Sequence, residues 1–160
     1  MTNEVTQLLV EKRVGVSASP DRAFKHFTEA VGQWWPLGSH SVSAGALGIA
    51  ARSCGFDRRQ GGEIYEITAH GERETWGTIT VWDPPHRLSF TWHPGLPVAE
   101  ATLVEVRFED RADGGCELIL KHTGWEARGE KARDVWQSYQ TGWDAVLLDG
   151  YQADLDKKSS

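Results

Sequence analysis

Apolar and polar side chains alternate through residues 7–17, which predicts a half-buried strand at the start of the chain. Ser19 and Pro20 then begin a predicted helix, because a hydroxyl can cap the first turn and proline is tolerated within it. That helix must end by Trp35, since the proline that follows disfavours helical dihedral angles in the residue before it. Residues 36–50 are rich in glycine and serine and predict a loop, with room for one helical turn.

Further strands follow one another from residue 51 to residue 123. Alternation is clearest in the last two, which favours antiparallel pairing with one wet face, because buried parallel strands have continuous apolar runs. Paired glycines at 59–62 and 112–115, and the prolines of 83–86, mark the turns. The predicted strands are about 51–57, 63–69, 74–82, 87–93, 101–109 and 115–123. Which face of the 63–69 and 74–82 strands points inward is left undecided by the pattern.

The last thirty residues change to a helical period and predict one long helix at about 128–155. Gly142 lies on its apolar stripe, where glycine costs about 1 kcal/mol relative to alanine. Close approach of the helix to a sheet or a ligand would compensate for that cost. An apolar sheet face needs a cover, so we expect the helix to cover it within a single α+β domain spanning 1–160. The residues expected to face the sheet are Gly142, Trp143, Val146 and Leu147.

Charge and composition exclude some classes of partner and location for the protein. The net charge is -6 without a basic stripe, so we expect no nucleic-acid partner. No apolar run approaches the roughly 20 residues of a membrane span, and the first twenty residues lack the apolar stretch of a signal peptide. We therefore expect no membrane insertion and a cytoplasmic location, while a homodimer is left open. Cys54 and Cys116 are expected to be reduced core residues that are not bonded to each other.

Several short motifs, in this order, resemble the START-like, birch-pollen-allergen-like (SRPBCC) superfamily, and most of all its AHSA group, the homologues of the activator of heat-shock-protein ATPase. They are VSASP at 16–20, WWP at 34–36, GGE at 61–63, GTITVWDPPHRLSFTW at 77–92, LILKHTGW at 118–125 and GW at 142–143. The resemblance implies a helix-grip fold, in which an antiparallel sheet of about seven strands wraps around a long C-terminal helix, with short helical segments after the first strand. It also implies a deep cavity between sheet and helix that takes apolar molecules. It brings no transferable catalytic motif.

Eight tryptophans are the most unusual feature of the composition. Each indole can bury a large apolar area while directing one N–H, so they indicate either a core of large side chains or an aromatic-walled cavity. His122 is expected to point inward by strand parity, as a core histidine or as a polar handle for a ligand. His93 shares the polar face of its strand and is expected to point outward. Trp35 and the loop after it are candidates for a gate. The candidate ligand-binding residues are Phe27, Trp34, Trp35, Trp76, Trp92, His122 and Trp143.

The chain contains none of the short motifs that identify common catalytic or nucleotide sites, such as GxSxG, GxGxxG, the P-loop or HExxH. Its histidines form no pair at i, i+2 or i, i+4, so we predict neither a metal site nor a cofactor. The leading hypothesis is binding of a small hydrophobic molecule, lipid-like or aromatic, between the sheet and the C-terminal helix. One alternative is an enzyme of the cyclase/aromatase or hydrolase type that uses residues such as His122 in the same cavity. Another is a chaperone-associated accessory protein, as the AHSA resemblance suggests.

Overall fold

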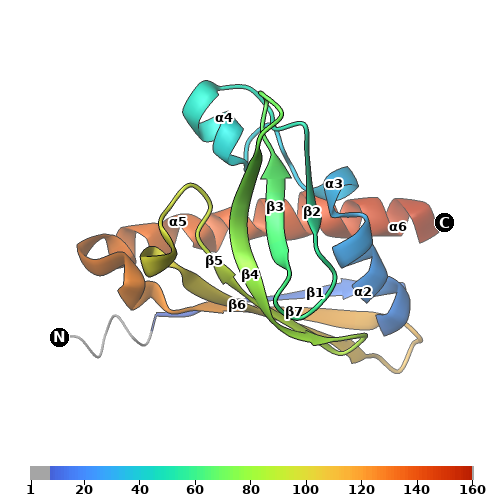
Figure 1. The fold of residues 1–160 in the computed structure, drawn as a ribbon. Coiled ribbons are helices and arrows are strands. Elements are labelled where there is room, and N and C mark those ends of the chain that lie inside the picture. Colours follow the sequence, from blue (N-terminus) through green and yellow to red (C-terminus); the bar gives the residue numbers. More distant parts are fainter. Residues whose placement is uncertain (1–7, 160) are drawn as a thin grey trace.

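A curled antiparallel sheet of seven strands carries the fold of residues 8–159, the part of the chain that the computed structural model describes (Figure 1). The strands are β1 (Val10–Val16), β2 (Ser53–Phe56), β3 (Glu63–Ile67), β4 (Arg73–Asp83), β5 (Arg87–Trp92), β6 (Thr102–Asp110) and β7 (Cys116–Thr123). Their spatial order is β1-β7-β6-β5-β4-β3-β2, so the first strand joins the last one and every other neighbour is a hairpin partner. The predicted strands and their antiparallel pairing are therefore confirmed.

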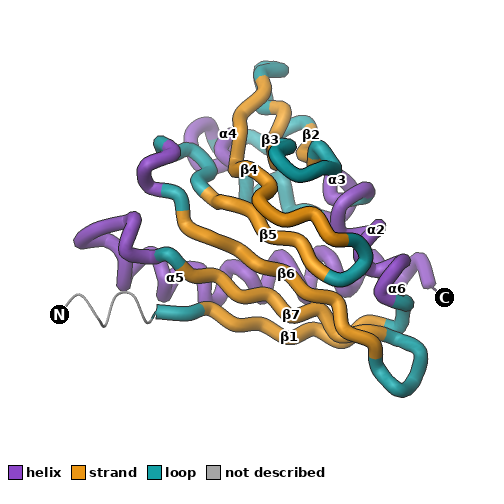
Figure 2. Tube along the Cα trace, turned by 60° about the horizontal axis from the view of Figure 1, so that its bottom comes forward, coloured by secondary structure: helices purple, strands orange, loops and turns teal. Residues whose placement is uncertain are grey.

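Three short helices follow β1 and one long helical segment ends the chain. They are α2 (Pro20–Glu29), α3 (Val31–Trp34) and α4 (Val42–Leu47), then a 3₁₀ segment η2 (Trp125–Lys131), α5 (Ala132–Asp144), the π-helical η3 (Ala145–Gln152) and α6 (Ala153–Ser159). A further 3₁₀ turn, η1 (Val98–Glu100), precedes β6. Ser19 caps α2 as predicted, since its hydroxyl accepts from the main-chain N–H of Arg22. Figures 1 and 2 show the segment from α5 to α6 running across one face of the sheet, which is the predicted helix-grip fold.

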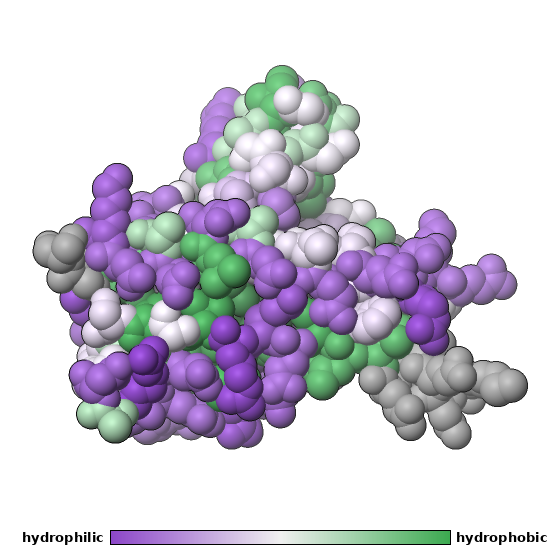
Figure 3. Space-filling model, turned by 180° about the vertical axis from the view of Figure 1, so that it is seen from behind, coloured by the Kyte–Doolittle hydropathy of each residue, from purple (hydrophilic) through white to green (hydrophobic). Residues whose placement is uncertain are grey.

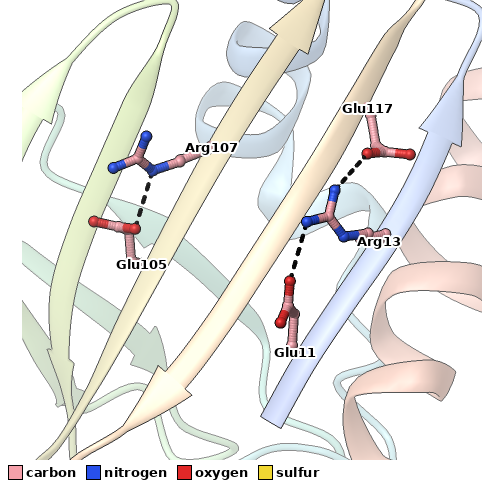
Figure 4. A network of polar contacts seen from close by, with 5 residues as sticks. All are labelled: Glu11, Arg13, Glu105, Arg107 and Glu117. Atoms are coloured by element: carbon pink, nitrogen blue, oxygen red, sulfur yellow. Dashed lines mark hydrogen bonds and ion pairs between the residues drawn. The ribbon is translucent and has the colours of Figure 1, made fainter. Parts of the chain in front are cut away.

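The sheet face away from the long helix is polar and solvated. On this face Arg13 of β1 donates to Glu11 and to Glu117 of the neighbouring β7, while Arg107 pairs with Glu105 (Figure 4). Because these ion pairs are exposed, each contributes at most about 1 kcal/mol. They keep the outer face wet and charged, as the alternation predicted. None of the helices in residues 8–159 is both long and apolar enough to cross a membrane.

The inner face of β4 breaks the period-of-two rule at two points. Pairing of β3 with β4 skips Trp76, so the side chains of Trp76 and Ile79 are both buried although they are three residues apart. A second register shift, in the pairing of β4 with β5, follows Ile79. Such bulges insert an extra residue and re-aim the side chains that follow. On β3 it is Ile64 and Glu66 that point inward. The structure thus shows which residues of β3 and β4 point inward, which the sequence pattern left undecided.

Two expectations about particular positions were wrong. His93 is only 6% exposed, because the strand ends at Trp92 and strand parity does not extend beyond it. The main-chain N–H of His93 donates to the main-chain carbonyl of Trp76. Gly142 does not approach the sheet, because a methyl group built there would meet no atom within 4 Å apart from the backbone of its own helix; of the two expected compensations, approach to a sheet or to a ligand, only the first is contradicted. Close approach occurs at Gly150, where the same methyl would lie 2.6 Å from a main-chain carbonyl oxygen.

The remaining expectations about the core agree with the structure. Trp143, Val146 and Leu147 of the long helical segment are buried in the core under the sheet. Cys54 and Cys116 are both free and buried, in strands β2 and β7 that are not neighbours in the sheet. Both cysteines therefore contribute to packing rather than to a disulfide.

Candidate functional site

A cavity of about 750 Å³ opens between the sheet, helix α4 and the long C-terminal segment. Its volume lies in the range typical of sites for drug-sized ligands. Four tryptophans form the inner wall, α4 contributes one rim, and α5 contributes the other. The lining residues are Trp35, His40, Ser41, Val42, Gly45, Ala46, Trp76, Trp92, Pro94, Gly95, Ser138, Tyr139, Thr141, Gly142, Trp143 and Val146. Seen from the helix side, the surface is largely hydrophilic, and the part at the top that carries α4 projects from it and has a hydrophobic tip (Figure 3). Leu47 and Ile49, at the end of α4, are exposed.

The inner wall brings together tryptophans from four separate parts of the chain. Trp35 follows α3, Trp76 lies on β4, Trp92 ends β5 and Trp143 lies on α5. The ring centre of Trp35 is 5.1 Å from that of Trp76, 5.8 Å from that of Trp92 and 6.0 Å from that of Trp143. These distances fall within the range in which aromatic rings attract one another in edge-to-face or offset arrangements. The four rings thus pack as one aromatic cluster beside the cavity, in which Trp35 is half-buried and the other three rings are at most 4% exposed.

All four indole N–H groups of this wall donate to the protein itself. Trp35 donates to the carbonyl of His40 at 2.7 Å, and Trp76 donates to Glu66 at 2.8 Å. The other two donate to side chains, Trp92 to Tyr139 at 3.0 Å and Trp143 to His122 at 2.9 Å. Each ring is therefore held in one orientation, and the wall has no indole N–H left for a ligand.

Glu66 is a fully buried carboxylate that ties the rim of the cavity to its wall. It accepts hydrogen bonds from the main-chain N–H groups of Val42 and Ser43, at the start of α4, at 2.7 and 3.1 Å. The Ser43 hydroxyl and the Trp76 indole complete its four donors. The two carboxylate oxygens act as acceptors in every one of these contacts. Sequence reasoning missed Glu66, because its only signal was an acid at the same strand parity as Ile64.

His122 belongs to a hydrogen-bond chain behind the wall rather than to its surface. An indole can only donate, so the bond from Trp143 makes Nδ1 the acceptor and assigns the ring hydrogen to Nε2. Nε2 lies 2.7 Å from the hydroxyl of Thr102, which in turn donates to the carbonyl of Trp92. Burial and, to a smaller extent, the nearby charge of Arg128 together lower the pKa of His122 to about 3. The neutral imidazole therefore fixes Trp143 and cannot act as a proton donor to the cavity.

The structure assembles four of the seven candidate residues on the cavity wall, namely Trp35, Trp76, Trp92 and Trp143. His122 lies directly behind Trp143, whereas Phe27 and Trp34 lie in the core, where both rings contact Tyr151.

Tyr139 was missed as a site residue, because in the sequence it is one more apolar-stripe position of the last helix. Its hydroxyl oxygen accepts from Trp92, and its ring centre lies 5.0 Å from that of His122 and 5.3 Å from that of Trp125. His40 was missed as well; its Nδ1 lies 2.7 Å from the hydroxyl of Ser39. These two are the titratable side chains among the lining residues. Within residues 8–159, no three His, Cys, Asp or Glu side chains lie close enough together to hold a metal ion.

Several known proteins share this fold. A solution structure of the Aha1 dimer from Colwellia psychrerythraea is 16% identical, with a TM-score of 0.68 over 94% of this chain and 97% of that one. The anthrahydroquino-γ-pyrone synthase Txn09, solved as a complex with SUM, is 31% identical, with a TM-score of 0.57 over 82% of this chain and 86% of that one. The self-sacrificing resistance protein CalC from Micromonospora echinospora is 25% identical, with a TM-score of 0.65 over 94% and 95%.

The search of curated proteins found no significant match. The model of one protein family, described as Activator of Hsp90 ATPase homolog 1-like protein, matches residues 17–151. That match covers strands β2 to β7 and the long helical segment as far as Tyr151, and thus every residue that lines the cavity. The resemblance identified from the sequence motifs is confirmed, and this chain belongs to the family of Activator of Hsp90 ATPase homolog 1-like proteins.

Proposed function

We propose that the protein binds a small planar aromatic molecule in the cavity between sheet, α4 and α5. The observation that carries the proposal is the wall of four tryptophans, whose ring centres lie 5.1 to 6.0 Å from that of Trp35 or from one another. An aromatic ligand gains about 0.5–1.5 kcal/mol from each favourable ring contact beyond the burial of its area. An alkyl chain gains only the burial. The wall therefore favours an aromatic ligand over a lipid-like one.

The pre-ordering of the wall supports the same ligand class. Because every wall indole is already hydrogen-bonded within the protein, the rings lose little freedom when a ligand arrives. Binding energy is then not spent on ordering side chains. A flat, rigid ligand benefits most from flat, rigid walls, since it too has little freedom to lose.

The name of one of the two relatives with 25% identity or more supports a role with small molecules. Txn09, at 31% identity, is a synthase named for an anthrahydroquino-γ-pyrone, and CalC, at 25% identity, is described as a resistance protein. The name of the Txn09 product describes fused planar rings, which is the ligand class that the tryptophan wall favours.

A second candidate is an enzyme of the cyclase type that acts on such a ligand. The identity with Txn09 favours it, as does a phenol, Tyr139, that faces the cavity. General acid–base chemistry needs a matched pair of groups within reach of the ligand. The titratable lining side chains are Tyr139 and His40, and His122 is held neutral behind the wall. Binding therefore remains the function that the geometry supports better.

Titration with fluorenone, a planar tricyclic ketone, tests the proposal through the tryptophan emission of the protein. We expect saturable quenching at one-to-one stoichiometry. Gly142→Leu should weaken binding at least about tenfold, because Gly142 lines the cavity and a Cβ there meets no side chain and no other segment within 4 Å, so the leucine would extend into the cavity. Gln137→Leu, an exposed position on the same helix outside the lining, is the matched control and should bind as the wild type does. Absence of saturable binding, or equal binding by Gly142→Leu, would contradict the proposal.

A further inference from the structure

Most of the polar side chains that line the cavity already donate within the protein. The four indole N–H groups are used, as described above. The hydroxyl of Ser41 donates to the carbonyl of Leu37, and that of Thr141 donates to the carbonyl of Ser138. Two lining side chains retain a hydrogen that they can offer to a ligand, Tyr139 and Ser138, and His40 can offer a third in the tautomer that carries its hydrogen on Nε2. Ser138 is exposed at the rim, whereas Tyr139 is half-buried against the wall.

Tyr139 is the best fixed of these three groups. Its oxygen accepts from the indole of Trp92 at 3.0 Å, and its ring packs against the fully buried His122 and Trp125. Within residues 8–159, no group accepts the hydrogen of its hydroxyl. A hydroxyl that already accepts one hydrogen bond is polarised and donates a second one more strongly. Tyr139 therefore offers a donor of fixed position.

Two tryptophan rings lie close to that donor. The ring centre of Tyr139 lies 6.3 Å from that of Trp143, and the ring centre of Trp92 lies 5.8 Å from that of Trp143. The chain from Trp143 through His122 and Thr102 to the carbonyl of Trp92 connects these two rings behind the wall. The donor and the aromatic surfaces beside it are thus parts of one hydrogen-bonded unit.

We infer that Tyr139 selects planar aromatic ligands that carry a carbonyl oxygen, by donating its hydroxyl hydrogen to that oxygen. The inference rests on the proposed function and adds the functional group of the ligand that the site recognises. A site that offers a fixed donor discriminates against a ligand of the same shape without an acceptor, because the donor then remains unpaired in the occupied cavity. Aromatic ketones, quinones and pyrones fit this description. Their hydrocarbon analogues, and analogues that carry only an N–H donor, do not.

Three tricyclic probes of nearly the same shape test the inference: fluorenone with a carbonyl, fluorene with a methylene group and carbazole with an N–H. For the wild type we expect fluorenone to bind roughly tenfold more tightly than the other two probes. Tyr139→Phe should reduce fluorenone affinity to the level of fluorene and leave fluorene itself unchanged. Constant fluorene affinity also shows that Trp92, which loses its acceptor in this variant, keeps its place.

His40→Ala and Ser138→Ala are the matched controls, since each removes one of the two other available hydrogens. The His40 variant keeps the main-chain carbonyl that accepts from Trp35. Both variants should retain the preference for fluorenone. Loss of the preference in either one, or its persistence in Tyr139→Phe, would overturn the inference. Equal binding of the three probes by the wild type would overturn it too, while leaving the proposed function intact; failure of every probe to bind would contradict the proposed function itself.

A spectroscopic measurement keeps the inference testable should Tyr139→Phe fail to fold. The carbonyl stretching frequency of fluorenone bound to the wild type should be lower than in a hydrocarbon solvent, because a donated hydrogen bond weakens the double bond. An unshifted frequency would overturn the inference.

Discussion

Replacement of Glu66 by glutamine is the sharpest perturbation of the link between the rim of the cavity and its wall. The wild-type carboxylate accepts from two main-chain N–H groups at the start of α4, from the hydroxyl of Ser43 and from the indole of Trp76. Glutamine keeps the size and shape of the side chain but turns one acceptor oxygen into an NH₂ donor. The variant therefore changes hydrogen bonding and charge without leaving a cavity.

The magnitude follows from counting the donors on each oxygen. One oxygen accepts from Val42 and Trp76, and the other accepts from the N–H and the hydroxyl of Ser43. In either orientation of the amide, at least one N–H of the protein then faces an NH₂ group, although the Ser43 hydroxyl can turn to accept. A hydrogen bond to a charged group contributes about 1.5–3 kcal/mol, so we expect the variant to lose about 2–3 kcal/mol of unfolding free energy.

Urea unfolding followed by tryptophan fluorescence measures this loss. An unchanged slope of the unfolding free energy against urea concentration would show that the unfolded state is unaffected. Glu109→Gln is the matched control, because Glu109 is exposed on β6 and its replacement should change the free energy by less than about 0.5 kcal/mol. Amide hydrogen exchange at Val42 and Ser43 should also accelerate in Glu66→Gln. A loss below about 0.5 kcal/mol for Glu66→Gln would refute the view that this carboxylate holds α4 on the sheet.

Three further predictions follow from buried groups and from glycines. The pKa of His122 is about 3 in the folded protein, below its value of about 6.5 in the unfolded chain, so the unfolding free energy should fall as the pH drops below about 6.5, by at most about 1.4 kcal/mol per pH unit. In urea titrations at several pH values, His122→Asn should lack this dependence of the unfolding free energy on pH, and an equal dependence in both proteins would contradict the prediction. Burial raises the pKa of the Cys54 thiol to about 12 and that of Cys116 to about 11, so neither should react with an aromatic disulfide reagent until the protein unfolds; fast labelling of the native protein would contradict this. Gly142→Ala should stabilise the protein by up to about 1 kcal/mol, because its methyl meets open space, whereas Gly150→Ala should destabilise it, because its methyl would lie 2.6 Å from a carbonyl oxygen; the opposite order of thermal midpoints would refute the assignment of the close approach.

The parts of the fold that could be predicted are those with local signals. The hydroxyl of Ser19 and the ring of Pro20 identify a helix start by chemistry that acts within one turn. Alternation in the 101–109 and 115–123 segments identifies strands whose inner residues are buried as expected. Each of these signals is confined to a few neighbouring residues, so tertiary contacts did not alter it.

The parts that could not be predicted depend on contacts between distant segments. Trp76 is buried because β3 and β4 pair with a bulge, and the one nearby signal is Gly77, where any side chain would collide with the main-chain carbonyl of Thr91 on β5. Glu66 can be buried because donors from α4, about 24 residues earlier in the chain, satisfy it. The hydroxyl of Tyr139 accepts from the indole of Trp92 only because the sheet brings the end of β5 beside α5. Sequence periodicity placed both Trp92 and Tyr139 on buried faces, but it could not show that they meet.

The most direct test of the aromatic cavity is a titration followed by the eight indole N–H resonances of uniformly ¹⁵N-labelled protein. When fluorenone is added, the signals of Trp35, Trp76, Trp92 and Trp143 should shift together and saturate at one equivalent, since their rings form the wall. The signals of Trp82 and Trp136, which lie outside the lining, should stay in place. Shifts confined to these two outer tryptophans, or no saturable shift of the four wall signals, would contradict the account.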